Sequence, residues 1–205
     1  MNKLLKAGVL LIILAIPVFV FLFLKSFGVN HYQVPLYYTA DTTVSFPDCP
    51  DLNLPHQVKF QENSDHSFII RDNYLVFAMV DAIQPGQESS EKVGQLARLT
   101  NAVPDDSYQV ITFTNIDPDK FKSTFEGIYH STDQWHLKNV NENVLQNFSR
   151  CGLLLPKEQT NFSNNLFVLV DPDGMIRGYY QGTSREEIDR LVLELKILIR
   201  EREID

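Results

Sequence analysis

The two cysteines of the chain, Cys49 and Cys151, are the residues with the most direct capacity for chemistry. They stand too far apart in sequence to form the short Cys-x-x-Cys motif of thiol redox enzymes. In an oxidising compartment they could form one disulfide, and closing a loop of about 100 residues would stabilise the fold by roughly 4 to 5 kcal/mol on the chain-entropy model. A second alternative stays open, in which Cys49 and Cys151 are separate thiols.

The histidines and acidic residues show no arrangement that is typical of a catalytic or metal site. No pair of histidines has the spacing that brings two imidazoles to one face of a helix. The acidic residues are explained more simply as solvated loops, helix starts or a helix cap, and no Gly-x-Ser-x-Gly motif of a hydrolase occurs. We therefore expect that the chain is not an enzyme. The histidines are His31, His56, His66, His130 and His136.

Length and charge narrow the possible functions further. The chain has 205 residues and a formal net charge of -8 at pH 7. An acidic chain offers no basic surface to a nucleic-acid backbone, so we expect no nucleic-acid partner. The length suits one domain with a substantial core, preceded by a short non-globular segment.

The first 25 residues differ in composition from the rest of the chain. After Lys3 and Lys6, residues 7–24 form a run of 18 residues without charge, which is long enough to cross the hydrocarbon core of a bilayer. We expect residues 1–25 to be a single-pass anchor that contacts the membrane through residues 4–24. A cleaved secretory signal is the alternative, but residues 25–29 offer no small-residue cleavage site. The positive N-terminus predicts a cytoplasmic start and a domain on the exported, periplasmic or equivalent, side.

The remaining residues are expected to form a tether and one folded domain. Residues 26–45 show no period and no cap, so we expect a tether there and the domain over residues 46–205. An edge strand at residues 58–61 is expected to open the domain as part of a short hairpin. The apolar run at residues 74–80 predicts a buried central strand, and helical spacing predicts a helix over residues 88–100. A second strand at 108–113 precedes a helix that begins at Asp117 and Pro118.

The C-terminal third has the clearest pattern. Asn141 is expected to cap a short helix that stops at Gly152, and residues 166–180 predict a hairpin with a turn at 171–174. Ser184 and Glu187 form a capping box ahead of a final amphipathic helix. This order of elements predicts an α/β fold of the thioredoxin-like class, with a mixed β-sheet sandwiched by helices and one N-terminal transmembrane helix before it.

Several segments resemble one known family. Residues 166–183, followed by residues 187–191, are similar to the C-terminal signature of the SCO/SenC family. Asp117 with Pro118, and the tryptophan-containing segment at residues 133–137, agree with that family as well. The resemblance covers roughly residues 46–200. Members of the family are membrane-anchored, thioredoxin-like copper chaperones of cytochrome c oxidase assembly.

The resemblance also implies where a copper site should lie. In the family, a Cys-x-x-x-Cys-Pro loop after the central strand and a histidine before the hairpin bind copper, because thiolates and imidazole suit the cuprous ion. These three ligands align here with Val80, Gln84 and Ser163, or for the histidine with the neighbouring Asn164 and Asn165. All three ligands are missing, and Cys49 and Cys151 do not fall at ligand positions. We therefore expect a degenerate site with no metal and no cofactor.

Two hypotheses about function follow. The first is a non-catalytic accessory or interaction protein, related to assembly of a copper-dependent respiratory oxidase, that binds an unidentified protein partner. The alternative is a residual thiol redox or copper-binding protein that uses Cys49 and Cys151. A peroxidase on this fold would need a reactive cysteine at the head of the first helix, where the sequence has Ile83-Gln84-Pro85-Gly86.

Overall fold

A computed structural model describes residues 3–27, 33–43, 46, 48–49, 52–59 and 73–204 of the chain. The chain divides into two compact units, Met1–Gln33 and Val34–Asp205. The first unit contains one helix, and the second contains a sheet with its covering helices. Two of the histidines considered above, His31 and His66, lie outside the described residues.

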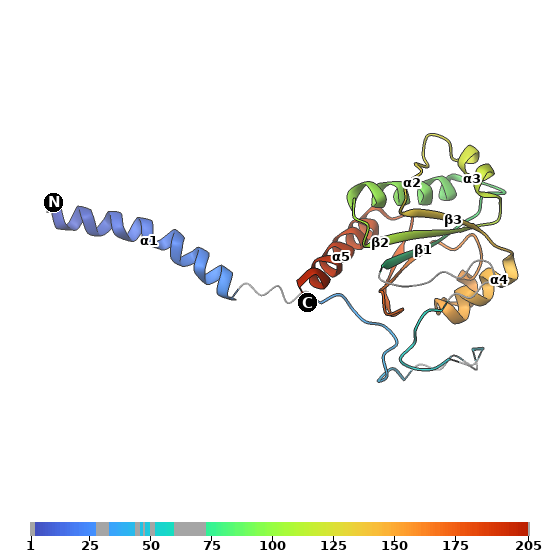
Figure 1. The fold of residues 1–205 in the computed structure, drawn as a ribbon, viewed down its shortest axis with the longest axis horizontal. Coiled ribbons are helices and arrows are strands. Elements are labelled where there is room, and N and C mark those ends of the chain that lie inside the picture. Colours follow the sequence, from blue (N-terminus) through green and yellow to red (C-terminus); the bar gives the residue numbers. More distant parts are fainter. Residues whose placement is uncertain are drawn as a thin grey trace. The chain divides into compact units, whose positions relative to one another are not determined.

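The centre of the second unit is a mixed five-stranded sheet. Its strands are β1 (Tyr74–Val80), β2 (Tyr108–Thr114), β3 (Trp135–Asn139), β4 (Leu166–Val170) and β5 (Ile176–Gln181). They are arranged in the order β3-β2-β1-β4-β5 (Figure 1). The strand β2 is parallel to both β1 and β3, whereas β4 is antiparallel to both β1 and β5. The strands predicted at residues 74–80, 108–113 and 166–180 are present, and β3 is an additional strand that the sequence pattern did not predict.

Helices cover both faces of this sheet (Figure 1). One face packs against α2 (Gln87–Ala102), α3 (Pro118–Thr124) and α5 (Arg185–Ile204). The other packs against α4 (Glu142–Asn147), which continues into the π-helical turn η1 (Phe148–Gly152). A short 3-10 helix, η2 (Lys157–Gln159), precedes β4. The predicted α/β thioredoxin-like fold with a mixed sheet between helices is therefore confirmed.

The central strand β1 shows why the sheet needs a cover on each face. All seven of its residues are buried. Its even-numbered side chains, such as Val76 and Val80, belong to the core under α2 and α5, and its odd-numbered ones, such as Phe77, belong to the core under α4. Successive side chains of a strand point to opposite faces, so a continuous apolar run requires two apolar layers. Burial of each large apolar side chain contributes roughly 1.5 to 3 kcal/mol.

The helix starts follow the capping residues of the sequence. The carboxylate of Asp117 accepts a hydrogen bond from the N–H of Asp119 at 2.9 Å, and the side chain of Asn141 accepts one from the N–H of Val144 at 2.9 Å. Each bond satisfies a backbone donor that the first turn of a helix leaves free. At the start of α5, the hydroxyl of Ser184 accepts a longer bond of 3.4 Å from the N–H of Glu187.

The segment before the sheet packs against the domain. We call the described residues between 34 and 59 the N-terminal strap. The N–H of Tyr37 donates to the carbonyl oxygen of Ile176 at 3.0 Å, and the N–H of Val58 donates to that of Gly174 at 2.7 Å. Gly174 has φ +83°, and a Cβ atom there would lie 3.2 Å from the carbonyl oxygen of Val58, so glycine suits both the turn and the contact.

The N-terminal strap differs from two expectations of the sequence. A tether was predicted over residues 26–45, whereas the compact domain begins at Val34, because the backbone bonds of the strap join it to β5. An edge strand was predicted at residues 58–61. Residues 58 and 59 form no strand, because the backbone of Val58 bonds to the β4–β5 turn at Gly174; residues 60 and 61 lie outside the described residues.

The first unit consists of the helix α1 (Lys3–Phe27), which occupies the position of the predicted anchor. Its side chains at residues 11–23 are exposed, and those residues carry no charge. Among the described residues, no helix combines the length and the hydropathy that a membrane span requires. The predicted transmembrane helix is therefore not part of the confirmed fold.

Candidate functional site

The loop after β1 lies at the carboxyl ends of β1 and β2, next to the start of α2. The carboxylate of Asp81 accepts hydrogen bonds from the N–H of Ile83 at 3.1 Å and from the side-chain amide of Asn115 at 2.9 Å. The side-chain oxygen of Asn115 accepts a bond from the N–H of Ala82 at 2.9 Å. Asp81 and Asn115 therefore fix the backbone of this loop.

The three positions that the resemblance aligns with metal ligands have different environments. Val80 is fully buried and packs in the core under α2, whereas Gln84 and Ser163 are exposed. Of the alternatives to Ser163, Asn165 donates from its side chain to the hydroxyl of Thr183 at 2.8 Å.

A buried lysine connects strand β1 to the loop before β4, in which one of the ligands was expected. Lys92 extends from α2, and only 1% of its surface is exposed. Its ammonium group donates to the carbonyl oxygens of Met79 at 3.0 Å, Asn164 at 2.9 Å and Phe162 at 3.4 Å. Met79 lies in β1, one residue before its last residue Val80, and the other two belong to the loop before β4. We call Lys92 and these three residues the lysine junction.

Burial of the ammonium group has an electrostatic cost. It lowers the pKa of Lys92 to about 8, although the carboxylates of Glu88 and Asp81 act in the opposite direction and raise it. An ammonium group has three hydrogen-bond donors, and the lysine junction provides three acceptors for them. Lys92 is therefore a buried cation whose donors are all satisfied, so it can hold β1 and the loop before β4 together.

Asn164 adds a second link inside the lysine junction. Its side-chain amide donates to the sulfur of Met79 at 3.2 Å, and its side-chain oxygen accepts a bond from the N–H of Leu166 at 2.8 Å. The thioether of Met79 is the kind of soft ligand that a cuprous ion prefers. Here it faces an amide donor. In the part of the chain that the structure describes, no three His, Cys, Asp or Glu side chains form a group that could hold a metal ion.

The two cysteines form a disulfide away from the lysine junction. Cys49 of the N-terminal strap is bonded to Cys151 of η1, and their Cα atoms are 5.6 Å apart. Arg150 and Asp48 form an ion pair beside it. The sulfur of Cys151 lies 3.7 Å from the carbonyl oxygen of Asp48. This is a close contact and not a hydrogen bond, because a disulfide sulfur has no proton to donate. Both thiols are consumed, so neither is available as a free thiolate ligand.

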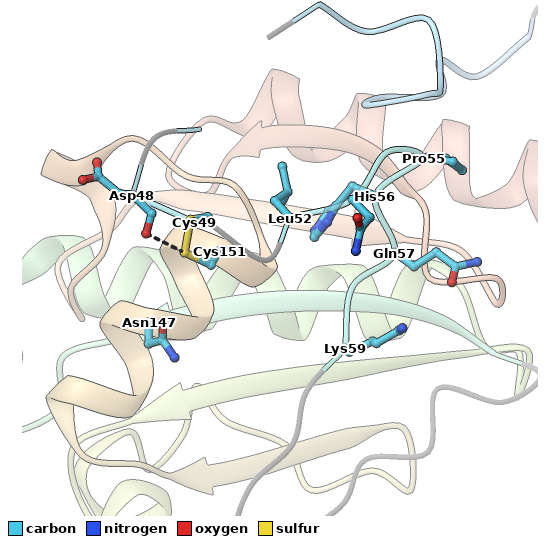
Figure 2. Close-up of a pocket in the computed structure, with 10 residues that line it drawn as sticks. Asp48, Cys49, Leu52, Pro55, His56, Gln57, Lys59, Asn147 and Cys151 are labelled. Carbon is cyan, nitrogen blue, oxygen red and sulfur yellow. Dashed lines mark hydrogen bonds between the residues drawn. A yellow bond between two sulfur atoms is a disulfide. The ribbon is translucent and has the colours of Figure 1, made fainter. Parts of the chain in front are cut away.

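A cavity of about 430 Å³ lies beside the disulfide (Figure 2). Both cysteines line it, together with polar residues of the N-terminal strap and of α4. The imidazole of His56, which is buried, bonds through Nε2 to the carbonyl oxygen of Gly152 at 2.7 Å and so also joins the strap to η1. The polar part of the lining consists of Asp48, Asn53, His56, Gln57, Lys59 and Asn147.

The other described histidines lie in β3 and in the loop before it. His136 lies on β3, and burial, followed by the nearby charge of Lys138, lowers its pKa. His130 belongs to the loop that precedes β3.

Lys92 was missed at the sequence level, although a signal for it exists. The apolar stripe of α2 contains Val93, Leu96 and Ala97, and buried positions recur at 89, 92, 93, 96, 97, 99 and 100. Lys92 is three residues after the buried position 89 and four residues before the buried position 96, so it lies on the apolar stripe itself. A lysine at a position of the apolar stripe predicts a buried amine, and a buried amine requires hydrogen-bond acceptors of its own.

Comparisons with known proteins agree with this geometry at the level of the fold. No protein-family model and no curated protein matches the sequence. The structure is similar to that of a SCO1/SenC family lipoprotein from Bacillus anthracis str. Ames, with a TM-score of 0.53 and 16% identity over 63% of this chain and 83% of that one. It is also similar to BsSco, a member of the Sco family of cytochrome c oxidase assembly proteins. That match has a TM-score of 0.51 and 15% identity over 62% of this chain and 80% of that one.

At such low identity the likeness concerns the fold alone. The chain folds as a thioredoxin-like domain that is structurally similar to Sco proteins, and the described part of it contains no group of side chains suited to a metal ion.

Proposed function

We propose that this chain is a non-catalytic accessory protein that assists assembly of a copper-dependent respiratory oxidase through protein contacts. The observation that carries the proposal is the lysine junction. A buried ammonium group joins Met79 of β1 to the loop before β4, and a SCO/SenC-like protein would need its copper ligands at the end of β1, in the loop after it and in this loop before β4. A fixed positive charge at this point disfavours a cuprous ion by repulsion.

The donor atoms near Lys92 support the same proposal. The junction offers backbone carbonyl oxygens, which are hard ligands, and these already accept bonds from the ammonium group. The soft sulfur of Met79 faces the amide of Asn164. A cuprous ion would have to displace Lys92 and reorient Asn164 to gain one soft ligand, whereas this ion prefers several.

An exposed apolar side chain near the junction supports the proposed contact with a protein partner. Ile83 is 63% exposed at the tip of the loop that Asp81 and Asn115 hold in place. An exposed apolar side chain on a fixed backbone suits a protein contact, because little conformational entropy remains to be lost on binding. We propose that this loop and the neighbouring residues 156–165 form the partner surface.

We also propose that α1 anchors the chain in a membrane, with the domain on the exported side. The large apolar side chains from Leu11 to Phe23, alanine and proline aside, are 46% or more exposed. A helix with apolar side chains all round requires an apolar environment, and a bilayer provides one. Lys3 and Lys6 at the N-terminus favour a cytoplasmic start.

Copper binding tests the loss of the metal site. The full chain, in detergent micelles, would be titrated with cuprous ion against a chromogenic chelator, alongside the Cys49→Ser/Cys151→Ser double variant. We expect neither protein to compete with the chelator. Tight one-to-one binding by the wild type that disappears in the double variant would instead make this chain a copper protein that uses its cysteines.

Oxidase activity tests the accessory role. Cells that lack this chain would be complemented with the wild type, with Ile83→Asp, or with Leu193→Asp as a matched control, since Leu193 is 55% exposed on α5. We expect the deletion and Ile83→Asp to lower the activity of the copper-dependent oxidase, and Leu193→Asp to restore it. Unchanged oxidase activity in the deletion strain would refute the proposal.

A further inference from the structure

The disulfide and the cavity beside it form a second candidate site, independent of the lysine junction and of the accessory role. Figure 2 shows the bond between Cys49 and Cys151 at one side of the cavity, with Leu52 and His56 of the N-terminal strap farther along it. A volume of about 430 Å³ is in the range of sites that hold small molecules. A disulfide in the wall of such a cavity is within reach of a molecule that enters it.

The two sulfur atoms differ in accessibility. Cys49 is 7% exposed and buried, whereas Cys151 is only partly buried on η1. Thiol–disulfide exchange requires direct approach of a thiolate to the sulfur that it attacks. An incoming thiolate therefore reaches Cys151 more readily, and Cys49 becomes the leaving group.

The charges of the lining favour an anionic molecule. The carboxylate of Asp48 is paired with Arg150, so its charge is largely balanced. Lys59, which is exposed, adds a positive charge to the lining. A carboxylate on the incoming thiol would gain from Lys59 an attraction that a cationic thiol would lack.

We propose that the cavity admits a small carboxylate-bearing thiol, which reduces the disulfide between Cys49 and Cys151. The thiolate attacks the Sγ atom of Cys151 and forms a mixed disulfide. The bond between the two cysteines breaks, and its electron pair leaves on the Sγ atom of Cys49, which takes a proton from solvent. A second molecule of thiol attacks the sulfur of the first, so that two thiols are oxidised to one disulfide and both cysteines are reduced.

Reduction detaches one point of the N-terminal strap and leaves others in place. The bond from His56 to the carbonyl oxygen of Gly152 and the bond from Val58 to Gly174 do not depend on the disulfide. These contacts of the strap therefore remain, while the segment around Cys49 loses its covalent link to η1 and keeps the ion pair between Asp48 and Arg150. The proposed reaction thus modifies the strap near the cavity without unfolding the sheet.

Rates of reduction by two thiols of opposite charge test this proposal. The full chain, in detergent micelles, would be treated with glutathione, which carries carboxylates, or with cysteamine, which is cationic. Acid-quenched samples would be analysed by intact and peptide mass spectrometry. We expect an adduct on Cys151 and, at equal thiolate concentration, faster reaction with glutathione. One charge at about 7 Å in water changes such a rate roughly threefold.

Two lysine variants separate the site from general charge effects. Lys59→Met is expected to remove most of the preference for glutathione, whereas Lys157→Met, at an exposed lysine of η2 outside the lining, is expected to keep it. The proposal is overturned if the adduct forms on Cys49, if Lys59→Met retains the preference, or if reduction requires a denaturant.

Discussion

Replacement of Lys92 by methionine tests the lysine junction most directly. Methionine has a similar length and no charge, so Lys92→Met fills much of the same space and leaves the carbonyl oxygens of Met79, Phe162 and Asn164 without this donor. At pH 7 two effects oppose each other. The lost hydrogen bonds destabilise the fold, and removal of a buried charge stabilises it. The dependence of stability on pH separates these effects.

The sign of that dependence follows from the pKa of Lys92. Burial lowers the pKa from 10.5 in the unfolded chain to about 8 in the fold. Between these values the unfolded chain binds more protons than the folded one, so the free energy of unfolding rises with pH. The increment that the titration of Lys92 adds to the free energy of unfolding is present in full above pH 10.5. This increment is lost as the pH falls to about 8. Between pH 7 and pH 9.5 the expected gain is about 2 kcal/mol.

Urea denaturation of the full chain in detergent micelles at the two pH values measures this gain. The difference in unfolding free energy between the wild type and Lys92→Met should increase by about 2 kcal/mol from pH 7 to pH 9.5. Lys157→Met, at an exposed lysine, is the control and should show the same pH dependence as the wild type. A difference that stays constant or decreases with pH would refute the idea that the fold desolvates a charged Lys92.

Three further predictions probe other contacts, each by chemical denaturation. Cys49→Ser with Cys151→Ser should lower the unfolding free energy by about 4 to 5 kcal/mol, because the disulfide closes a loop of 102 residues; a loss of under 1 kcal/mol would contradict this account. Phe148→Ala should cost about 3 to 5 kcal/mol, because its ring lies 5.3 Å and 5.4 Å from those of Phe77 and Phe113; the wild-type midpoint would argue against it. Trp135→Phe should cost about 1 to 2 kcal/mol, since it removes a buried 2.9 Å bond to Thr112; adding Thr112→Val should make the loss smaller.

The sequence predicted those elements whose formation depends on local pattern. The apolar run at residues 74–80 matches β1, and Asp117 and Asn141 cap the helices that they were expected to cap. The strand β3 was missed because it lacks the continuous apolar run of β1 or β4 and forms by pairing with β2, where Trp135 lies opposite Val110. A short strand of this kind forms because a partner is available, and no local period reveals that partner.

The sequence could not predict contacts between distant residues. Lys92 bonds to a residue 72 positions away, and Cys49 bonds to one 102 positions away. Sequence reasoning left two alternatives open for the cysteines, because nothing in either segment indicates that the other is near. The N-terminal strap lacks a period because its backbone bonds go to single residues such as Ile176 and Gly174 rather than to a regular ladder.

An internal ammonium group differs from a bound metal ion in what it allows the loops to do. A metal can be taken up and released, so loops that need it can change between two arrangements. Lys92 is covalently part of α2, and its three acceptors lie within hydrogen-bond distance of its ammonium group. Its hydrogen bonds therefore form without any metal ion, whereas the contribution of a bound metal to stability depends on the metal concentration. These bonds tie β1 to the loop before β4 without any metal, which supports the proposed protein contact rather than metal transfer.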